Sequence, residues 1–504
     1  MKVAFLIIIL FSVSFAEQKA FVEDEILVKV KPDSNFVSLV ESFGDELLEV
    51  LGDLNWVRVR LREGLSVDEA IKIYKNHPEI ESSQPNFYYR LQAIPNDPSF
   101  TSLWGLTRIS APSAWDLTTG SSSVVVAVID TGIRYTHEDL SSNMWRNTAE
   151  IPNNGIDDDG NGFIDDYYGY DFRYNDPDPM DENGHGTHVA GTIGAVGNNS
   201  LGVVGVNWTV KLMAIKIYSA TANDTTSAML INAYNYVRMM RNRGVNIRVT
   251  NNSYADCPEA CGYDQATKDA LDALGNSGVL NVFAAGNNGR DIDVLPIYPA
   301  SYDSPHILTV ASSTSSDARS SFSNYGVRSV DLAAPGSGIL STYRNSDSSY
   351  ATLSGTSMAT PHVAGAAALL SGYNPSLSVA SLKATLMNTV DLLSAWNGLV
   401  KSGGRLNVDR ALRNQTICNF TLSTDTLDVP TKGGLFTVSV SAPQNCDYEA
   451  KSNARWVSIL GEKVFSGNGT VAFYVRVNNT VSRTATISIA DKTLTIRQRR
   501  NLKN

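Results

Sequence analysis

The middle of the chain contains several strongly apolar, β-branched runs, and this pattern constrains the fold more than any other feature. Strands that are apolar at every position are buried on both faces, as in parallel sheets covered by helices. Stretches with helical periodicity alternate with these runs and supply the covering layers. The sequence therefore predicts an α/β domain over residues 93–414. The expected strands are Val124–Ile129, Leu212–Tyr218, Val279–Ala284 and Ile307–Val310, and the clearest expected helices are Ala228–Arg241 and Gln265–Ser277.

The segments on either side of this domain have different patterns. Residues 17–92 predict the order strand, helix, strand, helix, strand of a ferredoxin-like α+β unit, with Ser66 and Glu69 as a helix capping box. Residues 417–499 show short alternating strands without helical periodicity, which predicts a small antiparallel all-β sandwich. The expected elements are Glu25–Lys31, Phe36–Phe43, Trp56–Leu61, Ile80–Tyr89, Phe436–Val440, Gly469–Val477, Thr484–Ile489 and Lys492–Arg497.

The first residues have the features of a secretory signal. Lys2 precedes the apolar run Val3–Phe11, and small residues follow as far as Ala16. The run is too short for a transmembrane helix, which needs about 20 residues. We therefore expect residues 1–16 to be a cleaved signal peptide, a secreted product and no transmembrane segment.

Export permits disulfide bonds, and the chain has 4 cysteines. Four cysteines allow about three pairings, of which we favour the local ones, Cys257 with Cys261 and Cys418 with Cys446. The chain carries 41 basic and 51 acidic side chains, a net charge of −10. This balance argues against a nucleic-acid partner, since nucleic-acid-binding domains usually carry a basic stripe.

Three segments of the central domain each carry a side chain suited to acyl-transfer chemistry. Asp130 ends the run Val-Ala-Val-Ile-Asp, where open α/β sheets place their sites, His185 opens a helix in Asn-Gly-His-Gly-Thr-His, and Ser357 opens another in Ser-Gly-Thr-Ser-Met-Ala. Singly, each segment also fits a loop cap or a turn. Together they supply a hydroxyl nucleophile, an imidazole that accepts its proton, and a carboxylate that fixes the imidazole tautomer. The combination predicts a catalytic triad.

The three segments resemble the signatures of the subtilisin-like serine proteases (subtilases), and their order is the order of that family. The resemblance covers nearly all of the central domain and implies a subtilisin-like parallel sheet. It implies that Asp130 orients the base, His185 is the general base and Ser357 is the nucleophile. His188 and His362 lie in the same motifs and are expected to be structural.

The resemblance also implies the groups that hold the substrate. Asn287, in Phe-Ala-Ala-Gly-Asn, is expected to donate a hydrogen bond to the oxyanion. Two short segments would form the walls of the first specificity pocket and pair with an extended substrate. Their small side chains predict a broad preference for large apolar or aromatic residues before the cleaved bond. The wall residues are Ser253, Tyr254, Ala255, Ala284, Ala285 and Gly286.

An acidic loop around residues 154–166 predicts a structural calcium site. It places oxygen ligands at alternate positions, with glycines at the turns, as in the first part of an EF-hand-like loop. Tyr168 stands where an EF-hand has its closing glutamate, so the loop is not an EF-hand proper. Carboxylates so close together repel one another unless a cation is present. The expected ligands are Asp157, Asp159, Asn161, the Phe163 carbonyl and Asp166.

A second calcium site is implied by the family resemblance alone. The loop Gly-Asn-Asn-Ser-Leu-Gly-Val over residues 197–203 resembles the strong calcium loop of the subtilases, and Asn-Asp-Pro at residues 96–98 resembles a thermitase-type start. The implied ligands are the carbonyls of Gly197, Leu201 and Val203 with the side chains of Asn199, Asp139 and Asp97.

The flanking units also resemble known modules. Residues 17–92 are similar to the inhibitor-like propeptide of subtilases, which would act as an intramolecular inhibitor until self-cleavage near residues 92–95. Residues 417–499 resemble BACON-type β-sandwich domains through Trp456-Val-Ser-Ile and the closing Ile-Arg-Gln498. Such a module either binds a glycan or cell-surface ligand or serves as a spacer.

We therefore expect a secreted, calcium-stabilised serine endopeptidase that acts on protein or peptide substrates and is made as a self-processing zymogen. The alternative is a catalytically inactive protease scaffold that serves as a surface- or glycan-binding protein, although no triad member is missing. A lipase or esterase would need Gly-x-Ser-x-Gly with the histidine last in order, and Gly355-Thr-Ser357-Met-Ala359 lacks the second glycine.

Overall fold

The computed structural model describes residues 21–32, 34–88, 93–254, 262–414, 420–442, 446–461, 464–479, 481–490 and 492–499. The expected signal peptide, residues 89–92 with the first residue of the expected cleavage region, Ala255, and the cysteines Cys257, Cys261 and Cys418 lie outside these residues. The chain divides into two compact units, one up to residue 91 and one from residue 92 onward. No helix in the described ranges has both the length and the apolar composition to cross a bilayer.

The N-terminal unit is a four-stranded antiparallel sheet in the order β2-β3-β1-β4 with two helices, as the ferredoxin-like prediction requires. Its core lies between the helices and one face of the sheet. The capping box is present, because Ser66 and Glu69 bond each other's backbone N–H groups. Strand β2 was missing from the prediction, because its burial does not alternate. The elements are β1 Phe21–Val30, α1 Phe36–Ser42, β2 Glu46–Leu51, β3 Trp56–Arg60, α2 Val67–Lys75 and β4 Ile80–Phe87.

The central domain is built on a nine-stranded sheet whose strands are parallel, except that β14 at one edge is antiparallel to β15. This confirms the α/β prediction. In sheet order the strands are β14 Asp391–Leu392, β15 Gly404–Arg405, β11 Leu332–Pro335, β10 Ile307–Ser313, β9 Leu280–Ala284, β8 Ile247–Asn252, β5 Gly120–Asp130, β7 Thr209–Lys216 and β6 Gly169–Asp171.

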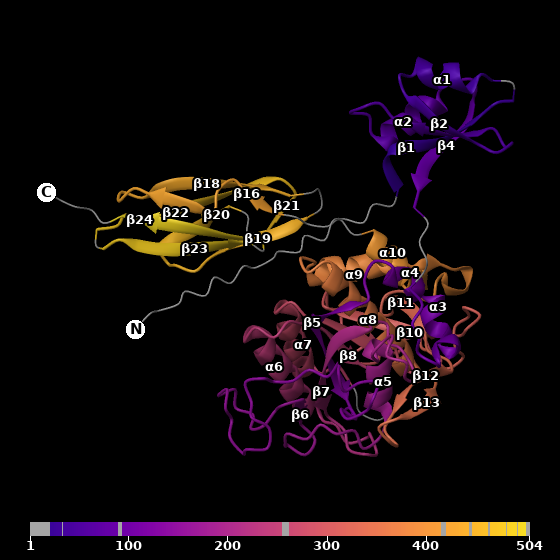
Figure 1. Ribbon diagram of the computed structural model, residues 1–504. Coiled ribbons are helices and arrows are strands. Elements are labelled where there is room, and N and C mark those ends of the chain that lie inside the picture. Colours follow the sequence, from indigo (N-terminus) through magenta and orange to yellow (C-terminus); the bar gives the residue numbers. More distant parts are fainter. Residues whose placement is uncertain are drawn as a thin grey trace, which may run out of the picture. The chain divides into compact units, whose positions relative to one another are not determined.

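Helices cover both faces of this sheet (Figure 1). Strand β5 is buried on both sides: Val126 and Val128 pack in the core that includes α8, whereas Ala127 and Ile129 pack in the core that includes α6 and α7. The continuous apolar pattern of β5 follows directly from this double burial. The remaining elements are α3 Trp104–Arg108, α4 Ala111–Trp115, α5 His185–Gly194, α6 Ser227–Asn242, α7 Gln265–Asn276, β12 Ile339–Tyr343, β13 Ser349–Leu353, α8 Thr356–Tyr373, α9 Val379–Asn388 and α10 Val408–Arg413.

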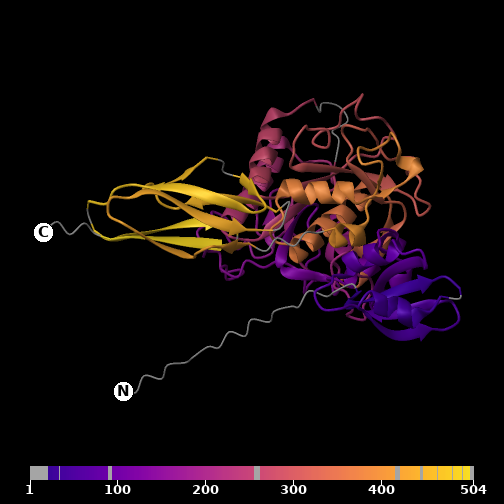
Figure 2. The same ribbon diagram turned by 90° about the horizontal axis from the view of Figure 1, so that it is seen from above.

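The C-terminal module is an all-β sandwich of a four-stranded and a five-stranded sheet, and its two sheets lie face to face (Figure 2). The core between them is apolar. The pairing is antiparallel as predicted, apart from β17, which runs parallel to β24. The strands are β16 Thr421–Leu422, β17 Thr426–Val429, β18 Gly434–Ser441, β19 Asp447–Ser452, β20 Val457–Leu460, β21 Val464–Ser466, β22 Gly469–Val475, β23 Arg483–Ile489 and β24 Lys492–Gln498.

Candidate active site

The structure brings Asp130 and His185 into direct contact. Asp130 is the last residue of β5 and is 1% exposed, and its Oδ1 lies 2.7 Å from Nδ1 of His185, the first residue of α5. Because a carboxylate only accepts hydrogen bonds, the hydrogen is on Nδ1, and Nε2 remains as the basic nitrogen. Burial lowers the pKa of His185, but the charge and hydrogen bond of Asp130 outweigh burial and hold this pKa above its ordinary value.

Two glycines allow helix α5 to start against β5. Gly184 precedes the helix with φ of 110°, a left-handed conformation that side chains strongly disfavour. A Cβ on Gly186 would lie 2.0 Å from the carbonyl oxygen of Gly132 and 3.2 Å from Cβ of Asp130. The close approach of the two elements, and with it the Asp130–His185 contact, therefore depends on these glycines.

Asp181 is a polar residue of this site that the sequence analysis missed. It is 4% exposed, and its Oδ1 accepts hydrogen bonds from the Thr131 hydroxyl and the Gly184 N–H, both at 2.8 Å. Its Oδ2 accepts from the Thr187 N–H at 2.9 Å. Asp181 thereby ties the start of α5 to the residue that follows Asp130. An acidic residue just before a helix N-terminus is the signal that could have identified it.

Ser357 lies in the first turn of α8 and lines the same cleft as His185 and Asp130. Its hydroxyl donates to the carbonyl oxygen of Ser253 at 2.9 Å, and the Ser253 hydroxyl donates to the Ser357 carbonyl at 2.9 Å. This reciprocal pair holds the start of α8 against the end of β8.

Asn287 lines the cleft with its amide held in one orientation. The N–H and hydroxyl of Thr356 donate to Oδ1 of Asn287 at 2.8 and 3.0 Å. The Thr356 hydroxyl in turn accepts from the Gly286 N–H at 3.1 Å. With Oδ1 fixed, Nδ2 is the group left to donate to a ligand. Thr356 is a second residue that the sequence analysis did not single out.

The cleft that joins these groups has a volume of about 410 Å³. Most of the predicted substrate-wall residues reach it, whereas Ala285 is fully buried beside Ile297, away from the lining. Strand β8 ends at Asn252, so Ser253 and Tyr254 follow the strand and do not belong to it. The Tyr254 hydroxyl donates to Asn252 Oδ1 at 2.9 Å, which fixes the ring. The wall residues that line the cleft are Ser253, Tyr254, Ala284 and Gly286.

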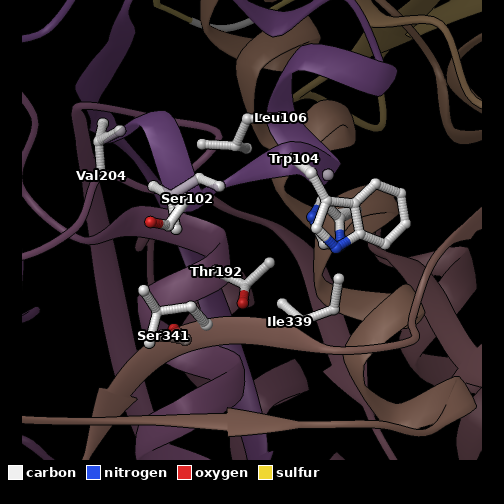
Figure 3. Close-up of a pocket in the computed structure, with 11 residues that line it drawn as sticks. Ser102, Trp104, Leu106, Thr192, Val204, Ile339 and Ser341 are labelled. Atoms are coloured by element: carbon white, nitrogen blue, oxygen red, sulfur yellow. The ribbon is translucent and has the colours of Figure 1, made fainter. Parts of the chain in front are cut away.

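The other two histidines of the motifs are buried. Burial, with a smaller contribution from the charge of His185, lowers the pKa of His188 to about 4, and burial lowers the pKa of His362 to about 4. His362 borders a separate cavity of about 20 Å³, which Figure 3 shows between Trp104 and Leu106 on one side and Ile339 and Ser341 on the other. That volume holds about one water molecule, not a substrate side chain.

The loop at residues 197–203 offers oxygen atoms that suit a calcium ion. Asp97 is 3% exposed, and one of its oxygens accepts from the Asn198 N–H at 2.7 Å, whereas the buried Oδ1 has no partner within the described ranges. Burial raises the pKa of Asp97, and the nearby charge of Asp139 adds to this effect. Two buried carboxylates with an unsatisfied oxygen fit a hard cation that takes oxygen ligands.

The side chains of this loop are already organised around Asp139. Its oxygens accept from the Asn199 amide at 2.8 Å and from the Val203 N–H at 2.9 Å. Within the described part of the chain, no hydrogen bond to a carbonyl oxygen of Gly197, Leu201 or Val203 occurs. Those carbonyls therefore stay available as ligands.

The acidic loop differs in detail from its sequence prediction. Ligand oxygens of Glu150, Asp157 and Asp159 lie within 4.8 Å of one another, and Glu150 had not been singled out. Asp166 is fully buried and accepts from the Tyr236 hydroxyl at 2.6 Å and from the amides of Asn147 and Asn161 at 2.8 and 2.9 Å.

Of the three remaining predicted ligands of the acidic loop, Asp166 and Asn161 have internal partners of their own. Burial raises the pKa of Asp166 to about 6. The side-chain Oδ1 of Asn161 accepts from the Phe163 N–H at 2.7 Å. Because their oxygens are clustered, Glu150, Asp157 and Asp159 are the carboxylates best placed for a cation.

Comparisons with known proteins place this geometry in a family. Residues 121–416 match the subtilase family, and residues 12–86 match the fervidolysin N-terminal prodomain. Thermitase from Thermoactinomyces vulgaris is 37% identical over 63% of this chain and 99% of its own length. A thermophilic serine proteinase from a Bacillus species is 32% identical over 78% of this chain and 88% of its own.

The solved structure of a protease from Pseudoalteromonas arctica is 28% identical and superposes with a TM-score of 0.51 over 63% of this chain and 98% of that chain. The family match covers more than half of the chain, and the relatives are matched over most of their length. The chain belongs to the subtilase family and is a subtilisin-like serine endopeptidase with an N-terminal prodomain.

Proposed function

We propose that the chain is a secreted endopeptidase that cleaves peptide bonds through Asp130, His185 and Ser357. The observation that carries the proposal is the 2.7 Å contact between buried Asp130 and His185 at a cleft that Ser357 also lines. Ser357 attacks the scissile carbonyl carbon as its proton passes to Nε2 of His185. Asp130 holds the imidazole in the required tautomer and stabilises the imidazolium.

The oxyanion formed by this attack needs donors that are already in place. Nδ2 of Asn287 and the N–H of Ser357 are the proposed donors, with the amide of Asn287 held by Thr356. Collapse of the tetrahedral intermediate transfers the proton from His185 to the leaving amine and leaves an acyl-enzyme. Water, deprotonated by His185, then releases the acid product and restores the Ser357 hydroxyl.

The hydroxyl of Ser357 has to leave the Ser253 carbonyl before it can bond His185. Catalytic hydrogen bonds are often long or misaligned before substrate binds and tighten in the complex. The resting bond to Ser253 therefore agrees with a triad that is completed when substrate enters.

The proposed substrate preference is for large apolar or aromatic side chains at the residue before the cleaved bond. Tyr218, Tyr254 and Ala284 supply apolar surface in a cleft of mixed polarity, and apart from the catalytic pair its described lining carries no charged side chain. Cleavage of a peptide library strictly after Lys or Arg would contradict this preference.

We also infer that the prodomain acts as the intramolecular inhibitor of this cleft and that calcium stabilises the mature enzyme. The prodomain match supports the first inference. The unpartnered oxygen of Asp97 and the cluster of Glu150, Asp157 and Asp159 support the second, because a bound ion would offset the repulsion of these carboxylates. Cys446 is disulfide-bonded, which fits an exported protein. The pairing of Cys446 with Cys418, and of Cys257 with Cys261, stays a prediction.

The test is the variant Ser357→Ala in the full chain. Loss of the nucleophile lowers kcat of subtilisin itself by about 10⁶-fold, and a loss of the same order is expected here, together with retention of the propeptide. A fluorophosphonate probe should label the wild type and not this variant.

The matched control is Ser354→Ala, which removes an exposed hydroxyl three residues earlier on the same turn. It should process, cleave and be labelled like the wild type. If the wild type were neither labelled nor processed, the alternative of an inactive, surface-binding scaffold would stand. Self-processing of the Ser357→Ala variant would remove Ser357 as the nucleophile.

A further inference from the structure

One end of the C-terminal sandwich gathers basic side chains. At this end β20 begins beside the end of β22, with Val457 opposite Val475, and β23 begins beside the end of β24, with Arg483 opposite Gln498. The chain enters the sandwich at the other end, where Thr421 of β16 pairs with the last residue of β18. In Figure 1 the basic end is where β24 finishes. Its members, which we call the basic end, are Lys432, Arg455, Arg476, Arg483, Arg497 and Arg499.

The charge of this end is predominantly positive, and its acidic neighbour is the exposed Asp428, which lies opposite Arg497 across β17 and β24. Residues 417–504 contain 11 basic and 6 acidic residues, a net charge of +5 in a chain whose total is −10. All members of the basic end except Arg483 are exposed. Within the described part of the chain, none of the exposed members takes part in an ion pair. Such a surface is complementary to an extended anionic partner.

Buried amides hold the basic end in one arrangement. Asn478, 1% exposed, donates its backbone N–H to the Thr431 carbonyl at 2.7 Å and its Nδ2 to the carbonyls of Val481 and Arg499 at 2.8 and 3.2 Å. Gln498, also 1% exposed, donates Nε2 to the carbonyls of Pro430 and Arg476, both at 3.0 Å. The basic residues are thus presented by backbone segments that are cross-linked to one another.

Two apolar side chains are exposed among these cations. Val477 is 51% exposed and Val481 is 67% exposed, and both flank the anchoring residue Asn478. Arg476 directly precedes Val477, and Arg483 follows Val481 after one residue, Ser482. Apolar side chains within a ring of cations suit insertion into the boundary between lipid headgroups and acyl chains, where the cations contact phosphates.

One face of the Trp456 indole at this end is covered by Arg483. The guanidinium carbon of Arg483 lies 4.1 Å from the centre of the Trp456 ring, so it covers one face of the indole. Arg483 is fixed there, because its terminal nitrogen donates to the carbonyls of Arg476 and Val477 at 2.8 and 3.1 Å. The exposed apolar side chains of Val477 and Val481 favour a lipid surface over an anionic polysaccharide, which would use the cations alone.

We propose that the basic end docks this protease on the surface of an anionic lipid bilayer, with Val477 and Val481 at the headgroup boundary and the arginines on the phosphates. The proposal goes beyond the proteolytic function and does not depend on it. The clustered basic side chains also make the interaction sensitive to salt, because dissolved ions screen the attraction between charges on the two surfaces.

The test is co-sedimentation of the full chain, carrying Ser357→Ala to prevent autolysis, with phosphatidylglycerol-containing vesicles and with pure phosphatidylcholine vesicles. Binding is expected only to the anionic vesicles and should fall as salt is raised. The double variant Arg476→Glu/Arg499→Glu should weaken it by at least about tenfold, because each cation near an anionic surface contributes substantially. Val477→Asp/Val481→Asp should weaken it as well.

The matched control is Lys451→Glu/Lys492→Glu, which makes the same change in net charge near the opposite end of the sandwich, where Lys451 lies opposite Ser488 and Lys492 opposite Ile489. It should leave vesicle binding within about twofold of the parent. Equal weakening by the control would show that net charge alone acts. Retention on heparin without binding to anionic vesicles would identify a polysaccharide surface, and either result would overturn the proposal.

Discussion

The catalytic cleft and the acidic loop both gather carboxylates, but they place them by different means. In the cleft, Asp130 and His185 are 55 residues apart and meet because one ends a buried strand and the other begins a helix packed against it. In the acidic loop, carboxylates bond backbone N–H groups of nearby residues, as Asp157 does with the N–H groups of Asn161 and Gly162 at 3.0 and 2.8 Å. The cleft depends on the fold, whereas the loop is organised locally.

This difference predicts that single substitutions have their largest effect in the cleft. Asp130→Asn should lower kcat by about 10⁴-fold, since it replaces the acceptor-only carboxylate that fixes the His185 tautomer with a neutral amide that can donate as well as accept. That magnitude is known for subtilisin itself, about 3 × 10⁴-fold, and is carried over here. Steady-state cleavage of a peptide substrate measures it.

The pH profile of the same variant sharpens the test. Asp130 raises the pKa of His185, so its loss should move the limb of the kcat/KM profile that reports deprotonation of His185 to lower pH. The control is Asp178→Asn, which removes an exposed carboxylate outside the cleft lining. An unshifted limb with retained kcat would mean that Asp130 does not govern His185.

The next largest effect is expected at Asn287. Asn287→Ala should lower kcat by about 10²–10³-fold with little change in KM, because the donor acts on charge that develops in the transition state; the figure is that of the equivalent donor of subtilisin. Asn288→Ala is the matched control, because Asn288 also lines the cleft while its amide oxygen lies 3.3 Å from the Asn324 amide. A larger loss at Asn288 would reassign the oxyanion donor.

The sequence predicted most of the site residues that regular helices and strands position. The runs that became β5, β7, β9 and β10 are largely apolar because both faces are buried, and polar residues that end or follow such strands reach the cleft. It did not predict β2, whose burial does not alternate, or the short strands β14 and β15, which have too few residues to show a pattern.

Residues that act through local hydrogen bonds were also missed. Asp181, Thr356 and Glu150 carry no periodic signal, since their roles depend on which backbone N–H groups face them after folding. Glu150 accepts from the Asp159 N–H at 3.0 Å, a contact that spacing alone does not specify. The sequence of the acidic loop thus predicted the type of site but not all of the residues that form it.

Buried histidines near the cleft should make the free energy of unfolding depend on pH. His188 and His362 are buried on the helices that carry the cleft, with a folded pKa of about 4 against an unfolded value near 6.5. The unfolded chain therefore binds more protons between these values, and the free energy of unfolding should fall as pH drops from about 6.5 to 4. Each histidine contributes up to about 3 kcal/mol to this loss.

Urea unfolding of the Ser357→Ala chain at several pH values measures this dependence. His362→Asn should flatten it, whereas His77→Asn, in the separate prodomain, should leave it unchanged. A free energy of unfolding that stayed constant between pH 6.5 and 4 would contradict the neutral, buried state of both histidines.

The smallest expected effect tests the acidic loop itself. A bound calcium ion at about 100 times its dissociation constant stabilises the folded state by about 2.7 kcal/mol, so chelation should lower the Tm by a few degrees. Glu150→Gln should remove the part of this response that belongs to the acidic loop, and Asp97→Asn the part that belongs to the loop at residues 197–203. Asp166→Asn should leave the chelator response intact, because Asp166 already bonds three donors. If Asp166→Asn abolished the response while Glu150→Gln preserved it, the ligand set drawn from the sequence would be right, and the one drawn from the clustered carboxylates would be wrong.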